Sequence, residues 1–277
     1  MRRRCPAVRL WLHVDDATTS CPAWASPYEA EACAAPGRVR APWGRSGNDL
    51  VLIYTGGTTG MPRGVMWRQH DLFLASNTTG DPKTADLNHV RDRLGRNTPP
   101  VGLPAAPLMH GTGFVFAATI LNRGGAVLTL PGQSFDPAAL LDAVQASLVT
   151  NLCIVGDAFC RSIVEMLDSH PGRWDLSALK VVSSSGMVWS ASVKQRLLHH
   201  APGVLMTDFL NSSEASGLGR SVTSARRSGR SAGFRLGDNA FVTDDKGSPV
   251  IPGSRSPGRL AVRGRIPLGT IKTPRRP

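Results

Sequence analysis

The chain has 277 residues, and its composition, 41% hydrophobic and 19% charged, is ordinary for a globular protein and excludes disorder along the whole length. Its 32 Lys and Arg residues outnumber the 20 Asp and Glu residues, for a formal net charge of +12. These basic residues are scattered and form no basic segment interleaved with aromatic residues, so no nucleic-acid partner is expected.

Short apolar runs alternate with helical patterns from residue 49 onward, whereas residues 1–48 are rich in Pro, Ala and Arg and show no sustained period. The runs that predict strands are 50–54, 103–108, 126–130, 152–155, 179–183 and 204–209. The patterns that predict helices are 67–77, 113–121, 158–167 and 190–200, and a further helix is expected from Pro137 behind a capping segment at 134–136. Beyond residue 221, runs at 234–242 and 259–262 predict short strands between Gly/Pro turns.

Strands that alternate with helices of this length predict βαβ units. We therefore expect an α/β fold, with a mostly parallel sheet, flanking helices and a small β subdomain. The expected division is an irregular segment at 1–48, an α/β core at 49–220 and the small β subdomain at 221–277.

Cysteine spacing and hydropathy indicate the compartment. The five cysteines form no CxxC pair and no Cys/His metal spacing, and their odd number does not suit a disulfide framework. The apolar stretch behind the basic residues 2–4 is too short for a signal peptide, and the stretch 114–130 is interrupted by NRGG. We expect a cytoplasmic protein without a transmembrane segment.

The segment YTGGTTGMPRGV, residues 54–65, follows the first predicted strand. Glycines let successive backbone N–H groups converge on an anion, and ligands bind at the carboxyl ends of strands in α/β sheets, so this loop is a candidate cradle for a polyphosphate. The flexible positions and donors are Thr55, Gly56, Gly57, Thr58, Thr59, Gly60 and Arg63. The spacing of a Walker A loop is absent, and composition alone leaves an ordinary Gly/Thr-rich turn as the alternative.

The same segment closely resembles the signature Y-T-S-G-T-T-G-x-P-K-G-V of the adenylate-forming (AMP-binding) enzymes. Later segments keep that family's order: PLMHGTG at 107–113, SSG at 184–186, LNSSE at 210–214 and GSPVIPGSRSPGRLAVRG at 247–264. The resemblance extends from about Tyr28 to Lys272. It is strongest to the fatty acyl-CoA synthetases, chiefly through SSSGMVWSASVKQRL and SSEASG.

This resemblance implies an incomplete N-terminal domain of an adenylate-forming enzyme, acting as an ATP-dependent fatty-acid–CoA ligase. Such enzymes join a small-molecule carboxylic acid to AMP, release pyrophosphate, and transfer the acyl group to coenzyme A as co-substrate. The loop would hold the β- and γ-phosphates, Glu214 would coordinate Mg²⁺, Ser213 would touch the α-phosphate, and His110 would shape the entrance to the acyl site. The adenine pocket would consist of Ser185, Gly186, Leu210, Asn211 and Ser212.

Plainer interpretations stay open for single residues. A lone histidine after a strand is usually a polar surface or core residue, and Glu214 alone would be a solvated acid. A serine hydrolase is disfavoured, because the S-x-x-K at 177–180 lacks its partner motifs and no G-x-S-x-G is present. Three positions depart from the family pattern: Gly56 replaces a serine, Arg63 a lysine and Asn211 a glycine, and Asn211 puts a side chain near the adenine site.

The family pattern continues beyond both ends of these residues. Its first strands, its ribose-binding aspartate and its small C-terminal domain with the adenylation lysine have no counterpart in the 277 residues. We therefore expect little acyl-CoA formation from this chain alone. The alternative function is a catalytically impaired nucleotide-binding remnant, or one part of a split enzyme with a complementing chain.

Overall fold

The computed structural model describes residues 5–34, 37, 42–55, 63–77, 87–96, 98–132, 134–226, 233–254 and 256–272. The chain divides into two compact units, Met1–Ser46 and Gly47–Pro277. In the first unit, β1 (Leu12–His13) pairs in parallel with β2 (Ser26–Pro27), and α1 (Tyr28–Ala34) follows directly. No residue of α1 is buried, so this helix does not pack into a core.

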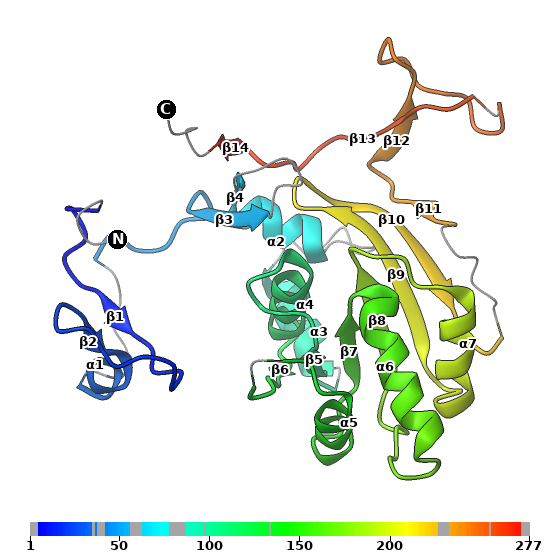
Figure 1. Cartoon of the computed structure of the whole chain (residues 1–277). Coiled ribbons are helices and arrows are strands. Elements are labelled where there is room, and N and C mark those ends of the chain that lie inside the picture. The colour runs from blue at the N-terminus through cyan, green and yellow to red at the C-terminus, as the bar shows by residue number, and fades with distance from the viewer. Residues whose placement is uncertain are drawn as a thin grey trace. The chain divides into compact units, whose positions relative to one another are not determined.

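Seven strands form the main sheet of the second unit, in the order β11-β10-β9-β8-β7-β5-β6. Each neighbouring pair from β6 to β9 is parallel, whereas β10 and β11 run antiparallel to their neighbours (Figure 1). The bounds are β5 (Val101–Pro104), β6 (Ala126–Val127), β7 (Asn151–Ile154), β8 (Val181–Ser185), β9 (Leu205–Ser212), β10 (Ala215–Thr223) and β11 (Arg235–Leu236). The predicted α/β fold with a mostly parallel sheet is confirmed.

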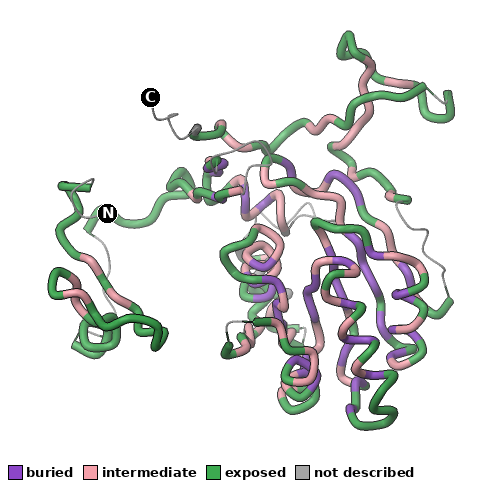
Figure 2. Tube along the Cα trace, in the orientation of Figure 1, coloured by how far each residue is buried: buried purple, intermediate pink, exposed green. Residues whose placement is uncertain are grey.

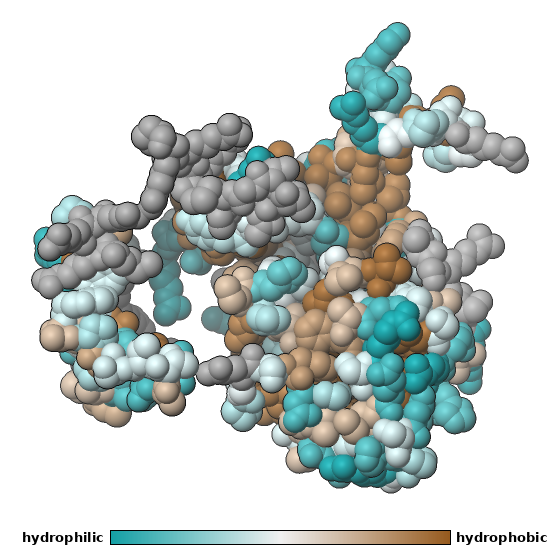
Figure 3. Space-filling view, in the orientation of Figure 1, coloured by the Kyte–Doolittle hydropathy of each residue, from teal (hydrophilic) through white to brown (hydrophobic). Residues whose placement is uncertain are grey.

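Helices connect these strands and cover the sheet. They are α2 (Gln69–Asn77), α3 (Leu87–Arg96), α4 (Gly111–Asn122), α5 (Pro137–Ala146), α6 (Gly156–Ser169) and α7 (Ala191–His200). In α6, Cys160, Ile163, Val164 and Leu167 are buried at helical spacing, which forms one apolar stripe. That stripe joins the buried residues of α5, α7 and β7 to β9 in one core (Figure 2). The outer surfaces of α6 and α7 are mostly hydrophilic (Figure 3).

A separate antiparallel sheet, in the order β14-β4-β3, carries the two strands that flank the glycine-rich loop. Its strands are β3 (Leu50–Thr55), β4 (Arg63–Arg68) and β14 (Gly269–Lys272). Ile53, Val65 and Trp67 are buried with Leu72 in a second, smaller core. The loop at 56–62 therefore joins strands of this small sheet, and the expectation that it follows a strand of the parallel sheet is wrong.

The predicted helix at 67–77 is also wrong in its first two residues. Trp67 and Arg68 end β4, and the helix begins at Gln69. The reason is a period of two: Val65 and Trp67 are both buried, and they pair with Ile53 and Val51 across the ladder. From the sequence alone, Trp67 fits the end of a strand and the start of the following helix equally well.

The C-terminal strands differ from the prediction in two places, one of which is β14, a strand that was not predicted. The expected strand at 234–242 is two strands, β11 and β12 (Ala240–Thr243), because the chain turns at Gly237, whose carbonyl accepts a hydrogen bond from the Ala240 N–H at 3.0 Å. β12 pairs with β13 (Arg259–Val262) in a two-stranded antiparallel sheet. β10 continues through residue 220 and β14 pairs with β4, so the division of the chain at 48 and 220 stays a prediction.

Candidate functional site

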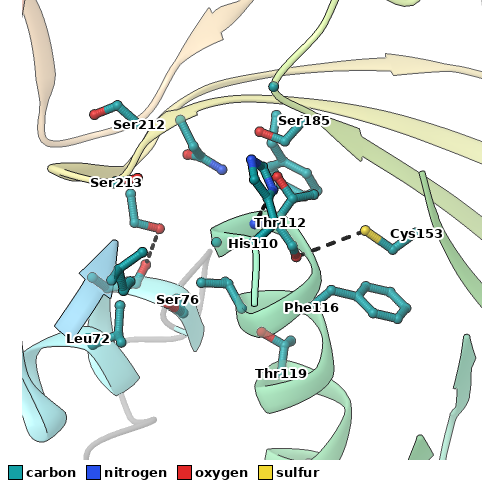
Figure 4. Close-up of a pocket in the computed structure, with 18 of the residues that line it drawn as sticks. Leu72, Ser76, His110, Thr112, Phe116, Thr119, Cys153, Ser185, Ser212 and Ser213 are labelled. Atoms are coloured by element: carbon teal, nitrogen blue, oxygen red, sulfur yellow. Dashed lines mark hydrogen bonds between the residues drawn. The ribbon is translucent and has the colours of Figure 1, made fainter. Parts of the chain in front are cut away.

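A cavity of about 390 Å³ lies at the carboxyl ends of β7, β8 and β9. Side chains from α2, α4 and the small sheet close its other sides (Figure 4). In open α/β sheets, ligands bind outside the carboxyl ends of the parallel strands. The cavity is therefore the candidate functional site, and its geometry follows from the strand ends that surround it.

One end of the cavity is rich in hydroxyl groups. Strand β8 ends in Ser183, Ser184 and Ser185, and Ser212 and Ser213 lie where β9 turns into β10. Gly186 follows β8 with a φ of +92°, a conformation that favours glycine. A Cβ at this position would lie 3.8 Å from the Thr112 hydroxyl and 3.9 Å from the His110 ring, so glycine keeps this part of the cavity open.

A buried ion pair joins helix α7 to strand β9 near this end of the sheet. Lys194 of α7 is 1% exposed and contacts the carboxylate of Asp208 in β9, which is 7% exposed. Burial raises the pKa of Asp208, while hydrogen bonds and charge from Lys194, and a hydrogen bond with Ser184, oppose the rise. The Ser184 hydroxyl also accepts a hydrogen bond from the Gly156 N–H at 2.9 Å, so this cavity-lining serine is held on two sides.

Helix α4 forms a second wall of the cavity. His110 is its N-cap residue, and its Nδ1 accepts a hydrogen bond from the Thr112 N–H at 3.3 Å. From there, Thr112, Phe116 and Thr119 lie on one face of the helix at spacings of four and three residues and line the cavity. His110 thus has a structural role at the start of α4 as well as a position in the cavity wall.

Cys153, at the end of β7, lines the cavity between these two walls. Its Sγ lies 4.0 Å from the Thr112 carbonyl oxygen, as the dashed line in Figure 4 marks. Burial raises the pKa of this thiol to about 12, so it stays neutral at physiological pH. It therefore acts as a small apolar wall residue rather than as a nucleophile.

The β9–β10 hairpin is fixed by hydrogen bonds at its irregular part. The Asn211 side-chain oxygen accepts a hydrogen bond from the Gly217 N–H at 2.8 Å, beside a register shift between Ala215 and Gly219. Trp67 Nε1 donates to the Ser213 carbonyl at 2.8 Å and so ties β4 to the same hairpin. Asn211 lines the cavity, and its amide oxygen also stabilises the hairpin.

The residues predicted from sequence divide into three groups. Those that line the cavity are Thr55, His110, Ser185, Gly186, Asn211, Ser212 and Ser213. Those that are described but do not line it are Arg63 at the start of β4, Leu210, which alternates with the lining residues of β9, and Glu214, which is exposed in the hairpin turn. Those that lie outside the described residues are Gly56, Gly57, Thr58, Thr59 and Gly60.

Sequence reasoning missed several residues of the cavity wall. Thr112, Phe116 and Thr119 carry a usable signal, because they follow His110 at helical spacing. Leu72 and Ser76 of α2 carry none, since only the tertiary arrangement brings that helix to the cavity.

Potential metal ligands do not gather into a cluster in the part of the chain that the structure describes. It contains no group of three or more His, Cys, Asp or Glu side chains arranged to bind a metal ion. In nucleotide sites, Mg²⁺ is usually held by one or two carboxylates together with substrate phosphates. Glu214, the predicted ligand, is exposed and directly follows Ser213, which lines the cavity. Among the same described residues, no helix has the length and apolarity needed to cross a membrane.

A mostly parallel sheet with a cavity at its carboxyl edge defines an α/β ligand-binding protein. The family described as AMP-binding enzyme matches residues 3–269, so the chain belongs to that family. A medium/long-chain-fatty-acid–CoA/3-oxocholest-4-en-26-oate–CoA ligase of Mycolicibacterium smegmatis is 36% identical over 82% of this chain and 42% of its own length. The medium-chain acyl-CoA ligase Mig of Mycobacterium avium is 34% identical over 80% of this chain and 41% of its own length. The chain thus spans less than half the length of these relatives.

Solved structures agree on the fold. The N-terminal subdomain of Klebsiella oxytoca NpsA, in complex with 3-hydroxyanthranilyl-AMSN, matches with a TM-score of 0.68 and 17% identity over 97% of this chain and 64% of that chain. A long-chain-fatty-acid–CoA ligase of Archaeoglobus fulgidus matches with a TM-score of 0.60 and 20% identity over 79% of this chain and 43% of that chain. At these identities the likeness concerns the fold alone.

Proposed function

We propose that the chain is the AMP-binding portion of an ATP-dependent fatty-acid–CoA ligase. The observation that carries the proposal is a cavity with two chemically different ends in a chain of the AMP-binding family. The ends of β8 and β9 contribute serine hydroxyls, whereas α2 and α4 contribute mainly apolar side chains. Ser76, Thr119 and Arg123 also line the cavity on the side of these helices. A hydroxyl-rich end suits a nucleotide, and an apolar end suits the hydrocarbon of an acid.

The proposed reaction has two steps. In the first, a carboxylate oxygen bonds to the α-phosphorus of ATP, and the bond to pyrophosphate breaks. In the second, the sulfur of coenzyme A bonds to the acyl carbon, and AMP leaves. Because the first step brings anions together, the site must supply oriented donors and positive charge.

The residues of this chain take the following proposed roles. Thr55, Arg63 and the loop from Gly56 to Gly60 bind the β- and γ-phosphates, Ser213 binds the α-phosphate, and His110 shapes the entrance to the acyl end. Ser185, Gly186, Leu210, Asn211 and Ser212 form the adenine pocket. Glu214 is the proposed ligand of Mg²⁺, which when bound neutralises phosphate charge.

The substrate proposed from the relatives is a medium- or long-chain fatty acid or a steroid carboxylic acid. We further propose a cytoplasmic location. Acyl-CoA formation would also draw on the parts of the ligase that the relatives carry outside the matched segment, in the same chain or in a complementing chain. The alternative of a nucleotide-binding remnant is less favoured, because these relatives are named as ligases.

The first test is MgATP binding to the whole chain by isothermal titration calorimetry. Gly186→Val puts a branched side chain against Thr112 and His110 in the cavity, and we expect it to weaken binding by about tenfold or more. The matched control is Gly172→Val, since Gly172 also has a positive φ, +76°, but no atom lies within 4 Å of its Cβ position. Unchanged affinity in a folded Gly186→Val variant would contradict the nucleotide site.

A second test concerns Glu214. Glu214→Gln removes the charge and keeps the shape of the side chain, so binding of ATP that depends on Mg²⁺ should weaken, while metal-free adenosine should bind as before. Equal loss of both would mean that Glu214 acts on the hairpin turn rather than on the metal. Pyrophosphate release with a panel of fatty acids then tests the first chemical step.

A further inference from the structure

Asn211 brings an amide side chain to the cavity at a position where the family pattern has glycine. Phe209 and Asn211 of β9 both line the cavity, whereas Leu210 between them does not. Side chains two residues apart in a strand point to the same face, so those of Phe209 and Asn211 both face the cavity. The glycine of the family pattern would offer a ligand no side-chain group at this place.

The hydrogen bond to Gly217 fixes the orientation of the Asn211 amide. A backbone N–H can only donate, so the side-chain atom that the Gly217 N–H meets at 2.8 Å is the amide oxygen, Oδ1. The NH₂ group is therefore at the end of the amide that is not turned toward Gly217. A donor that the hairpin already holds in place costs less entropy to use in binding than a freely rotating one.

The amide nitrogen, Nδ2, is unpaired but accessible. Among the described residues, the hydrogen bond of the Asn211 side chain is the one that Oδ1 accepts, and Nδ2 has no acceptor. In the same part of the chain, the buried side-chain atoms that lack a partner are Ser76 Oγ, Trp189 Nε1 and Thr223 Oγ1. Asn211 is half-buried, and its nitrogen is not one of these atoms, so this nitrogen keeps accessible surface. An occupant of the cavity can therefore reach an unused N–H donor.

The place of Asn211 in the sheet connects this donor with the nucleotide. Ser185 pairs with Phe209 in the β8–β9 ladder, and Asn211 follows two residues later, about 7 Å along the strand. In the proposed function, Ser185 and Asn211 both belong to the adenine pocket. The ring nitrogens of adenine that carry no hydrogen are acceptors, and the side-chain amide of asparagine is a well-matched partner for the edge of this base.

We propose that Asn211 is a base-specificity residue, whose NH₂ group donates a hydrogen bond to a ring nitrogen of adenine. This inference rests on the proposed function of the cavity and goes beyond it, because a site with the glycine of the family pattern has no side chain to form this bond. A nucleoside without the acceptor nitrogen would cover the Asn211 amide without pairing with it, which weakens binding.

The test compares adenosine with its three deaza analogues, in which C–H replaces N1, N3 or N7. Isothermal titration is performed on the whole chain, with MgATP as a separate titrant. We expect one analogue to bind about fivefold more weakly than adenosine. In Asn211→Asp an oxygen still accepts from the Gly217 N–H, but the NH₂ group is gone, so the preference for adenosine over that analogue should disappear. Adenosine carries no phosphate that the new carboxylate could repel.

The matched control is Asn151→Asp, the same substitution at the start of β7, outside the cavity lining. The Asn151 side-chain oxygen also accepts a hydrogen bond, from the Thr150 hydroxyl at 2.8 Å, so both variants keep an acceptor. Asn151→Asp should keep the preference for adenosine. If Asn211→Asp does not fold, Asn211→Gly takes its place, with the same loss of preference expected.

Two results would overturn the role of Asn211 and leave the proposed function standing. One is equal binding of adenosine and all three analogues, and the other is a preference that survives in the folded Asn211 variant. If neither adenosine nor MgATP binds to the unaltered chain, the proposed function and the inference fail together.

Discussion

Lys194 and Asp208 form a charged pair in the interior, behind the serines of the cavity. Lys194 Nζ also lies 5.2 Å from the centre of the Trp189 ring. Removing one member of a buried pair leaves the other without compensation, which typically costs about 3–5 kcal/mol of the free energy of unfolding. Replacing both members by apolar residues is much less costly, because no charge then stays buried.

We predict that Lys194→Met destabilises the protein and that its deficit in the free energy of unfolding is larger at pH 7.5 than at pH 5. Without Lys194 the pKa of Asp208, which burial already raises, rises further. An acid with a raised pKa in the folded state favours folding at low pH, and this contribution is lost as the pH rises through that pKa. Urea unfolding at the two pH values measures the effect.

The double variant Lys194→Met/Asp208→Leu should recover much of the loss. Arg196→Met on the same helix is the control: its partner Asp168 accepts from Arg196 Nε at 3.0 Å, but both side chains are exposed. That change should cost less than about 1 kcal/mol. A double variant as unstable as the sum of the single variants would show that packing, not uncompensated charge, explains the loss.

At the scale of elements, the sequence predicts best where one local signal is sufficient. β7, β8 and β9 each begin with apolar residues between helical patterns, and their parallel pairing follows from that alternation. β4 was not predicted, because its first residues, Arg63 to Val65, belong to the glycine-rich motif and Trp67 fits the period of a strand and of the next helix equally well. Ser76 could not be assigned to the cavity, since its place depends on how α2 packs beside α4. The cavity residues near His110 and Ser185 are predictable from sequence motifs, because motifs reflect the chemistry of a site rather than the packing of its helices.

Helix α5 illustrates a local signal that can be tested alone. The expected cap at 134–136 is confirmed: Asp136 Oδ1 accepts hydrogen bonds from the N–H groups of Ala138 at 2.8 Å and Ala139 at 3.2 Å, and Pro137 follows it. Asp136→Ala leaves these donors unpaired and should lower the free energy of unfolding by about 1 kcal/mol. Urea unfolding should show a lower midpoint with an unchanged slope.

Asp245→Ala is the matched control for the cap. Asp245 is highly exposed and pairs only with exposed Arg259 among the described residues, so its loss should change the free energy of unfolding by less than about 0.5 kcal/mol. An equal shift in both variants would mean that net charge, rather than helix capping, determines the result.

At the scale of the second unit, the cavity lies between two walls of unequal stability. The ends of β7, β8 and β9 belong to the large core, in which Leu140, Ile163 and Val182 are almost fully buried. The β3–β4 wall rests on the small core around Val65 and Trp67. Local opening requires less free energy where fewer apolar contacts are broken. The small sheet can therefore open while the large core stays folded.

Hydrogen–deuterium exchange should reveal this difference. We predict that amides of β8 exchange most slowly and that those of β3 and β4 exchange faster. Amides of β12 and β13, two strands in which no residue is fully buried, should exchange faster still. Trp67→Phe keeps a ring in the small core but removes the hydrogen bond to Ser213, so exchange in β3 and β4 should accelerate while exchange in β8 stays unchanged. Equal acceleration in β8 would show that both walls of the cavity unfold together as one cooperative unit.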